Sequence, residues 1–148
     1  MITKEQNYNK SCLFCASDYH LEMILLPYIK SKMNASKIII FTEDNLESSI
    51  STILSKVNFD ECDKEKIKKI NWNSNDFLKF EQVEKLVGEK LNIIINGSNN
   101  YIKKINKKIE DISIKNLEIV ECFHIDDQEI DLEKISKEYK TILNTQKM

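Results

Sequence analysis

Arginine is absent from this chain, and glycine and proline are nearly so. All 22 basic residues are lysine, and the 148 residues include two glycines and one proline. Without arginine, the bidentate fork that grips phosphate, carboxylate or guanine cannot form, and an arginine finger is excluded. The scarcity of glycine and proline excludes collagen-like, Gly/Ser-linker and proline-rich chains.

Long apolar runs and a strong charge of either sign are also missing. The longest apolar stretch is 23–29, far short of the roughly 20 residues that a transmembrane helix needs. The polar N-terminus has no hydrophobic targeting segment, and the net charge is −2. We therefore expect a cytoplasmic chain with reduced cysteines that binds neither nucleic acid nor membrane.

The composition is that of one globular domain. Hydrophobic residues make up 41% and charged residues 31% of the chain, which is ordinary for a protein with a buried core. We expect a flexible N-terminal tail over 1–10 and a single α/β domain over 11–148.

Short apolar runs alternate with apolar stripes at helical spacing. Strands are expected over 12–16, 37–42, 70–72, 91–95 and 117–123. Helices are expected over 18–29 with Asp18 as N-cap, over 44–57 behind an Asp44/Glu47 capping box, and over 63–69, 75–91, 101–112 and 132–143. This alternation predicts a three-layer α/β sandwich, Rossmann-like or RecA-like, with a five-stranded, mostly parallel sheet in the order 3-2-1-4-5.

Three stretches resemble the opening of one family of sensory domains. They are Ser11–His20 (SCLFCASDYH), Leu26–Ile29 (LPYI) and Lys37–Asp44 (KIIIFTED). Together with the closing stretch Glu118–Asp126 (EIVECFHID), they resemble MEDS domains, the methanogen/methylotroph DcmR-type sensory domains. Cys15 stands where that family usually has a Tyr, and the usual His before the first strand is missing. The resemblance implies a RecA/KaiC-like core without a working ATPase, used for sensing or regulation.

Motifs for phosphate, metal and redox chemistry are missing. Gly88 and Gly97 are not part of a G-x-x-x-x-G-K-[ST] or G-x-G-x-x-G loop. Cys12 and Cys15 form a C-x-x-C, but residues three apart on a strand face opposite sides, so they are expected to be core residues. We expect no cofactor, no metal site and no catalytic residue.

The predicted functional site lies at the carboxyl ends of the strands. In open α/β sheets, ligands bind there, beside the point where the strand order reverses. With the expected order, that point lies between the first and fourth strands. The loops that meet there, with their neighbours, supply the candidate ligand-binding residues Ser17, Asp18, Tyr19, His20, Thr42, Glu43, Asn96, Ser98, Asn99, Asn100 and His124.

Two classes of function fit this rim. The first is a non-catalytic sensory or regulatory module that binds a partner protein or a small effector. The alternative is a small enzyme, a transferase or hydrolase, that uses His20 and the loop 96–100 for acid–base work. Self-association into a homodimer is a further option, because most soluble oligomers are homo-oligomers.

Overall fold

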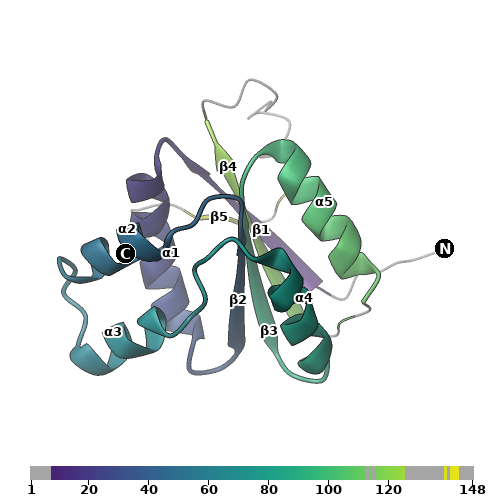
Figure 1. Cartoon of the computed structure of the whole chain (residues 1–148), viewed down its shortest axis with the longest axis horizontal. Helices are drawn as coiled ribbons and strands as arrows, with labels where there is room; N and C mark the ends of the chain where they lie inside the picture. The colour runs from purple at the N-terminus through teal and green to yellow at the C-terminus, as the bar shows by residue number, and fades with distance from the viewer. Residues whose placement is uncertain (1–7, 113, 115, 126–138, 140, 144–148) are drawn as a thin grey trace.

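Five parallel strands form the centre of the computed structural model (Figure 1). The structure describes residues 8–112, 114, 116–125, 139 and 141–143. The strands are β1 (Tyr8–Cys15), β2 (Lys37–Thr42), β3 (Leu91–Asn96), β4 (Leu117–His124) and β5 (Thr141–Leu143). The described helices are α1 (Asp18–Lys32), α2 (Glu47–Leu54), α3 (Glu61–Lys68), α4 (Asp76–Lys85) and α5 (Asn99–Glu110).

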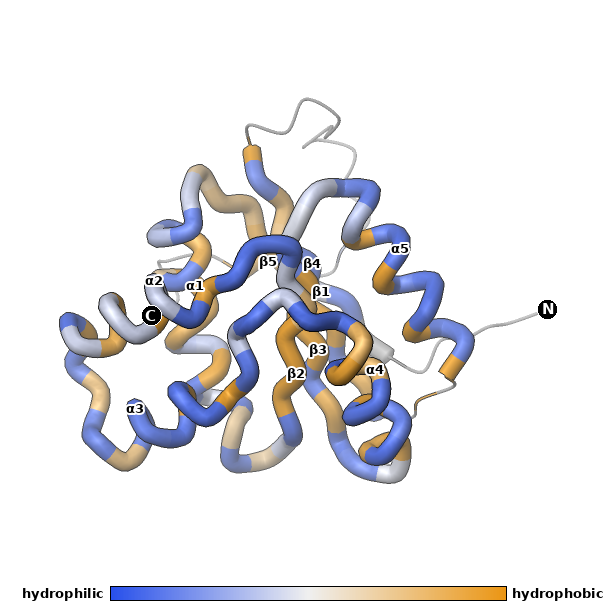
Figure 2. The backbone as a smooth tube through the Cα atoms, viewed as in Figure 1, coloured by the Kyte–Doolittle hydropathy of each residue, from blue (hydrophilic) through white to orange (hydrophobic). Residues whose placement is uncertain are grey.

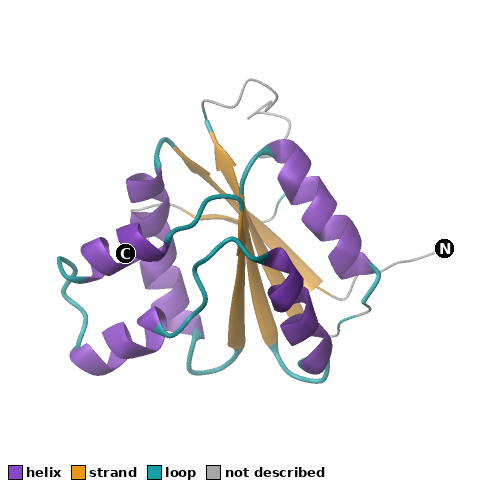
Figure 3. Ribbon diagram, viewed as in Figure 1, coloured by secondary structure: helices purple, strands orange, loops and turns teal. Residues whose placement is uncertain are grey.

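Helices cover both faces of the sheet, as Figure 3 shows, with α1, α2 and α3 on one side and α4 and α5 on the other. Leu13, Ile40, Ile94 and Val120 point into the first core, and Ile39, Phe41, Ile93 and Ile119 are among those that point into the second. Every residue of β3 is buried, which explains its run of three isoleucines, Ile93–Ile95. The buried side chains of Asn92 and Asn96 in the same strand are hydrogen-bonded. Figure 2 shows hydrophobic residues along the strands and an alternation of hydrophilic and hydrophobic residues along the helices. The expected α/β sandwich with a five-stranded parallel sheet is confirmed.

The strand order differs from the expected one. It is β2-β3-β4-β1-β5, so β1 lies between β4 and β5 and does not pair with β2. The expectation followed the rule that consecutive strands are usually neighbours. Here the connection through α1 crosses two strand positions, and β3 and β4 fill the gap.

Two segments have another structure than the sequence suggested. Residues 70–72 form no strand: Ile70 ends a turn, and Trp72 is buried, with its indole N–H donating to Ile67 O and its own carbonyl accepting from Leu46 N. The fifth strand is instead Thr141–Leu143, which the sequence assigned to the end of a last helix. The earlier part of that predicted helix, 132–138, lies outside the described residues, as do residues 1–7 of the expected tail. Tyr8–Lys10 of that tail belong to β1.

Helix starts also shift by a few residues. Ser17, not Asp18, caps α1, with its hydroxyl accepting from His20 N. The capping box at Asp44 does not form: α2 begins at Glu47, and Asn45 Oδ1 accepts from Glu47 N at 2.9 Å. Pro27 lies inside α1, which continues to Lys32. In the part of the chain that the structure describes, no helix has the length and apolarity needed to span a membrane.

The inward face of α4 is narrower than expected. Phe77, Phe80, Val83, Leu86 and Val87 were all expected to point inward, but only Val83 is buried. Phe77 is 72% exposed, while Phe80 and Leu86 are half-buried against the core. The helix ends at Lys85, so Val87 lies beyond it and cannot follow its periodicity.

Candidate functional site

The last residues of four strands are linked by side-chain contacts along the carboxyl edge of the sheet. In spatial order they are Cys15 of β1, His124 of β4, Asn96 of β3 and Thr42 of β2. His124 Nε2 lies 2.8 Å from Asn96 Oδ1, and Asn96 Nδ2 donates to Thr42 Oγ1 at 3.0 Å. The Thr42 hydroxyl donates to the carbonyl of Asp44 at 2.6 Å. We call these four residues the strand-end row.

The row fixes the tautomer of His124. Because the Thr42 hydroxyl donates to Asp44 O, it must accept from the amide nitrogen of Asn96, which turns Asn96 Oδ1 toward the imidazole. That oxygen can only accept, so His124 Nε2 carries the hydrogen. In the neutral ring, Nδ1 then has a free lone pair, and this nitrogen lies 3.5 Å from Cys15 Sγ.

Burial separates the members of the row. Cys15, Thr42 and Asn96 are each at most 1% exposed, whereas His124 is half-buried. The Cys15 thiol also lies 3.6 Å from the carbonyl of Phe123, so two acceptors are close to it. His124 is therefore the member of the row that a ligand can touch.

The loops after β2 and β3 are bound to each other. Glu43 Oε1 accepts from Ser98 N at 2.8 Å, and Glu43 N donates to Asn96 O at 2.9 Å. A Cβ atom at Gly97 would lie 2.7 Å from Glu43 Oε1 and 2.6 Å from Tyr101 Cδ2, so only glycine fits there. Ser98 caps α5, with its hydroxyl accepting from Tyr101 N. The structure thus brings Thr42, Glu43, Asn96, Ser98 and His124 together, as the sequence predicted.

The candidate residues at the start of α1 do not belong to the strand-end row. Ser17 is the helix cap, and His20 Nδ1 accepts from Ala16 N at 3.0 Å, so this ring holds its own turn. Asp18 is the first helical residue, and Tyr19 is 60% exposed on the outer side. The turn lies next to the end of β4, because Ile125 N donates to Cys15 O at 2.9 Å.

The remaining candidates are peripheral. Asn99 and Asn100 are the first two residues of α5, and Asn100 is exposed. The strand order was expected to reverse between the first predicted strand and the fourth, which are β1 and β3. These two strands are not neighbours, because β4 lies between them. The reversal falls instead between β1 and β4, because the strands that follow them in the chain, β2 and β5, lie at opposite edges of the sheet, and His124 is the last residue of β4. Asp126 lies outside the described residues.

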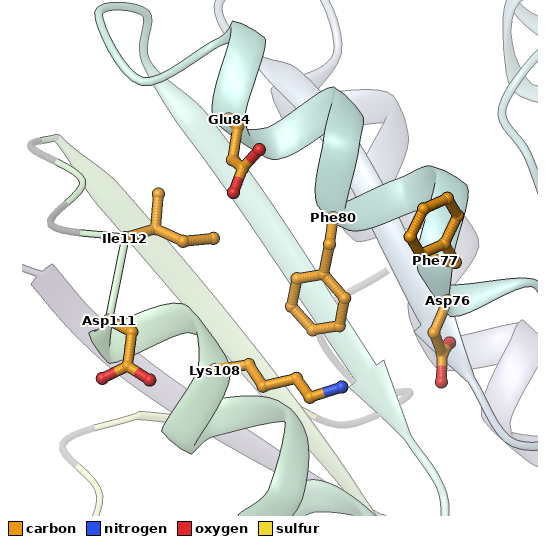
Figure 4. Close-up of a pocket in the computed structure, with 7 residues that line it drawn as sticks. All are labelled: Asp76, Phe77, Phe80, Glu84, Lys108, Asp111 and Ile112. Atoms are coloured by element: carbon orange, nitrogen blue, oxygen red, sulfur yellow. The ribbon is translucent and has the colours of Figure 1, made fainter.

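A shallow cavity of about 380 Å³ lies between α4 and α5, and no residue of the row lines it (Figure 4). The ring of Phe80 points from α4 toward α5, and Lys108 Nζ lies 5.3 Å from its centroid. Phe77 points away from this pair and is exposed. Asp76, at the edge of the cavity, accepts from the Tyr101 hydroxyl at 2.8 Å.

A second cavity, of about 220 Å³, lies between α1 and α2. It is lined by Tyr19, Glu22, Ser49, Thr52, Ile53 and Lys56. Glu22 is 1% exposed, and burial, opposed by a hydrogen bond from Ser49, raises the pKa of its carboxyl.

Sequence reasoning treated Cys15 as a core residue and did not select Glu22 or Lys79. Glu22 carries a readable signal: Leu25, Leu26 and Ile29, at i+3, i+4 and i+7, are all apolar, so this acid lies on the inward stripe. Lys79 is also buried, with its ammonium donating to Asn73 O, and burial lowers the pKa of that ammonium to about 8. No comparable signal marks Cys15, because its contact depends on the strand order.

Chemically, the row contains a nucleophile, a base and a group that orients the base. A Cys–His–Asn set of this kind activates the thiol in some hydrolases. Among the described residues, no group of three or more His, Cys, Asp and Glu side chains is placed to hold a metal ion. Comparison of the chain with protein-family models, with curated proteins and with solved structures found no match.

Proposed function

We propose that this chain is a non-catalytic regulatory module that binds a small effector at the carboxyl ends of β3 and β4, with His124 as the recognition residue. The observation that carries the proposal is the strand-end row, in which a half-buried imidazole is held in one tautomer by buried neighbours. A ring held in this way meets a ligand without losing further side-chain freedom, which favours binding.

Burial supports binding over catalysis. The thiol of Cys15 has no exposed surface, so the atom that would attack a substrate is enclosed. The side chains of Thr42 and Asn96 are enclosed too, and each is already hydrogen-bonded within the row. Of the two histidines, His20 uses Nδ1 to accept from Ala16 N, which makes it a structural part of its turn.

The same row supports a regulatory reading, because it joins distant loops. A ligand that changes the hydrogen bonding of His124 acts on Asn96, then on Thr42 and on the loop at Asp44 that leads to α2. A ligand shifts an equilibrium only by its differential affinity for two states, and this chain of contacts gives it one route to do so. The resemblance to DcmR-type sensory domains points the same way.

The enzyme alternative rests on one specific observation. Cys15 Sγ lies 3.5 Å from His124 Nδ1, while Nε2 of the same ring is held by Asn96 at 2.8 Å. If the chain is an enzyme, its chemistry would use Cys15 and His124 with Asn96, rather than His20 as the sequence suggested. That reading requires a motion that exposes Cys15.

The test is an NMR titration of the ¹⁵N-labelled chain with a panel of nucleotides, sugar phosphates, carboxylic acids and amines, each at millimolar concentration. We expect at least one compound to shift the amide signals of residues 42–44, 96–98 and 124–125. His124→Phe and His124→Gln should abolish that binding, while His20→Gln, which keeps an acceptor for Ala16 N, should retain it. Mass spectrometry of the mixture after prolonged incubation should show the compound unchanged.

Two results would overturn the proposal. If no compound moves these amides, the row is not an effector site. If a compound is converted to product and Cys15→Ala stops the conversion, the chain is a thiol enzyme.

A further inference from the structure

The cavity between α1 and α2 contains a buried acid that the fold does not explain. Glu22 projects from α1 into the cavity, and only 1% of it is exposed. Ionisable side chains are rarely buried so completely unless they are paired, because removing charge from water is costly. A residue of this kind points to something that occupies the space beside it.

Only one of the two carboxyl oxygens of Glu22 accepts a hydrogen bond from the described residues. Its Oε2 accepts from the hydroxyl of Ser49 on α2. Oε1 receives no hydrogen bond from the described residues, and no lysine among them forms an ion pair with Glu22. Oε1 is also not among the fully enclosed atoms that lack a partner, so it keeps a small exposed area, and Glu22 is one of the residues that line the cavity. One oxygen of a buried carboxyl thus has no protein partner and only a small opening, beside the cavity.

A positive charge lines the same cavity. Lys56 follows the end of α2, and its ammonium forms no ion pair within the part of the chain that the structure describes. No ion pair joins the exposed Lys56 to Glu22, although both residues line the cavity. Tyr19, Thr52 and Ile53 are among the other residues that line the cavity.

We propose that this cavity binds a small zwitterion of the α-amino-acid class. The ammonium group of the ligand pairs with Oε1 of Glu22, and its carboxylate pairs with the ammonium of Lys56. The side chain of the ligand packs on Ile53 and Tyr19. The site is separate from the strand-end row, and the inference stands whether or not an effector binds at His124.

Size and charge argue for this class over others. A cavity of about 220 Å³ holds the volume of roughly seven liquid waters at about 30 Å³ each, which suits a small molecule rather than a nucleotide. A simple anion would be repelled by the carboxylate of Glu22, and a simple amine would leave the ammonium of Lys56 without a partner. A molecule with both charges satisfies the two groups at once, and charge-assisted hydrogen bonds of this kind are the stronger ones.

The experiment uses the full chain and the twenty proteinogenic amino acids, each titrated separately and followed by ¹⁵N-edited NMR. We expect one or more of them to shift the amides of residues 19–22 and 49–56. For each amino acid that binds, the decarboxylated amine and the deaminated acid are then titrated. Both should bind at least about tenfold more weakly, because each loses one charge-assisted contact.

Variants test each of the two charged contacts and distinguish a loss of binding from a loss of folding. Glu22→Gln and Lys56→Met should each weaken binding at least about tenfold. Glu65→Gln and Lys66→Met, exposed residues on α3 outside the cavity, should leave it unchanged. Glu22→Gln removes a buried charge and keeps the shape, so the variant is expected to fold.

Three outcomes would overturn the proposal. The first is that no amino acid binds to the wild-type chain. The second is that the matched amine or acid binds as tightly as the amino acid. The third is that the shifts fall on residues 96–98 and 124–125, which would place the ligand on the strand-end row and support the effector site instead.

Discussion

His124 and Asn96 end two neighbouring strands, and their side chains meet in a 2.8 Å contact between Nε2 and Oδ1. Strands β3 and β4 are parallel and in register, with Asn96 opposite Cys122, so His124 lies two residues further along and reaches back over the edge. The amide of Asn96 is buried and bound to Thr42 on its other side, so it cannot turn without leaving a partner unpaired. Asn96 therefore sets the tautomer of His124.

Asn96→Ala tests this relationship. The change leaves the buried hydroxyl of Thr42 without its donor and His124 without its acceptor, so we expect the free energy of unfolding to fall by about 2 kcal/mol. Urea denaturation measures the loss. In the wild-type chain, the ¹⁵N shifts of His124 should report hydrogen on Nε2, and in the variant they should report a mixture of tautomers.

Asn100→Ala is the matched control, because Asn100 is an exposed asparagine at the start of α5. It should change the unfolding free energy by less than about 0.5 kcal/mol and leave His124 unaffected. Hydrogen on Nδ1 in the wild-type chain would contradict the bonding pattern of the row.

The fold class was predictable because its signals are local. The run Ile38–Phe41 and the stripe of Ile102, Ile105 and Ile109 identify a buried strand and an amphipathic helix from periodicity alone. Strand order is not a local property. It depends on how far the connection through α1 carries the chain, and the sequence around α1 contains no mark of that distance.

The candidate site was predictable to the same extent. Residues that end strands meet at one edge in any parallel sheet, so Thr42, Asn96 and His124 were expected at that edge before their neighbours were known. Which of them touch depended on the order. The contact of Cys15 with His124 arises only because β1 lies beside β4.

The four cysteines should differ sharply in reactivity. Cys62 is exposed, while Cys12, Cys15 and Cys122 are buried. Burial and the nearby Glu121 raise the pKa of the Cys12 thiol to about 11, and burial holds the pKa of Cys122 well above its usual value. Because the thiolate is the reactive form, we expect one thiol per native chain to react quickly with a disulfide reagent, and all four to react after unfolding. Cys62→Ser should abolish the fast phase. A second fast thiol that disappears in Cys15→Ala would favour the enzyme alternative.

Phe80 and Phe77 form a matched pair on α4. The ring of Phe80 packs on Phe41 with 4.5 Å between centroids, whereas Phe77 is 72% exposed. We expect Phe80→Ala to lower the unfolding free energy by about 2–4 kcal/mol, because it opens a void beside the core. Phe77→Ala should change it by less than about 0.5 kcal/mol. Equal losses in the two variants would contradict the observed orientation of α4.

Lys79 should make stability depend on pH in the alkaline range. Burial lowers the pKa of its ammonium from 10.5 to about 8, opposed by the nearby carboxylates of Asp76 and Glu47. Between those two values the unfolded chain binds more protons than the folded chain, so this residue makes the unfolding free energy rise with pH. The rise is at most about 3 kcal/mol. Urea denaturation at a series of pH values measures the unfolding free energy of the wild-type chain and of Lys79→Met, and the difference between the two should show this rise. Lys85 is an exposed lysine of the same helix, and the difference between the wild-type chain and Lys85→Met should not show it. A difference in unfolding free energy between the wild-type chain and Lys79→Met that does not change with pH would contradict the lowered pKa of Lys79.

The titration of Glu22 should change the unfolding free energy with pH in the opposite direction to that of Lys79, and in the acid range. Burial raises the pKa of its carboxyl above 4.5, Asp18 on the same helix adds to the rise, and the hydroxyl of Ser49 opposes it. Lys56 is the other charged group that lines the cavity.

In the folded chain the proton on Glu22 is therefore held to a higher pH than in the unfolded chain. As pH rises through the window that begins at 4.5, the folded state holds more protons, and the unfolding free energy of the wild-type chain falls. Glu22→Gln lacks this titration, so the stability of the variant relative to the wild type should grow with pH and then level off above the folded pKa. Urea denaturation from about pH 4 to about pH 8 measures the difference. Glu65→Gln, an exposed acid, should give a flat difference over the same range. If Glu22→Gln is also flat, the carboxyl is charged in the folded chain as readily as in water, and the cavity already supplies the partner that we assign to a ligand.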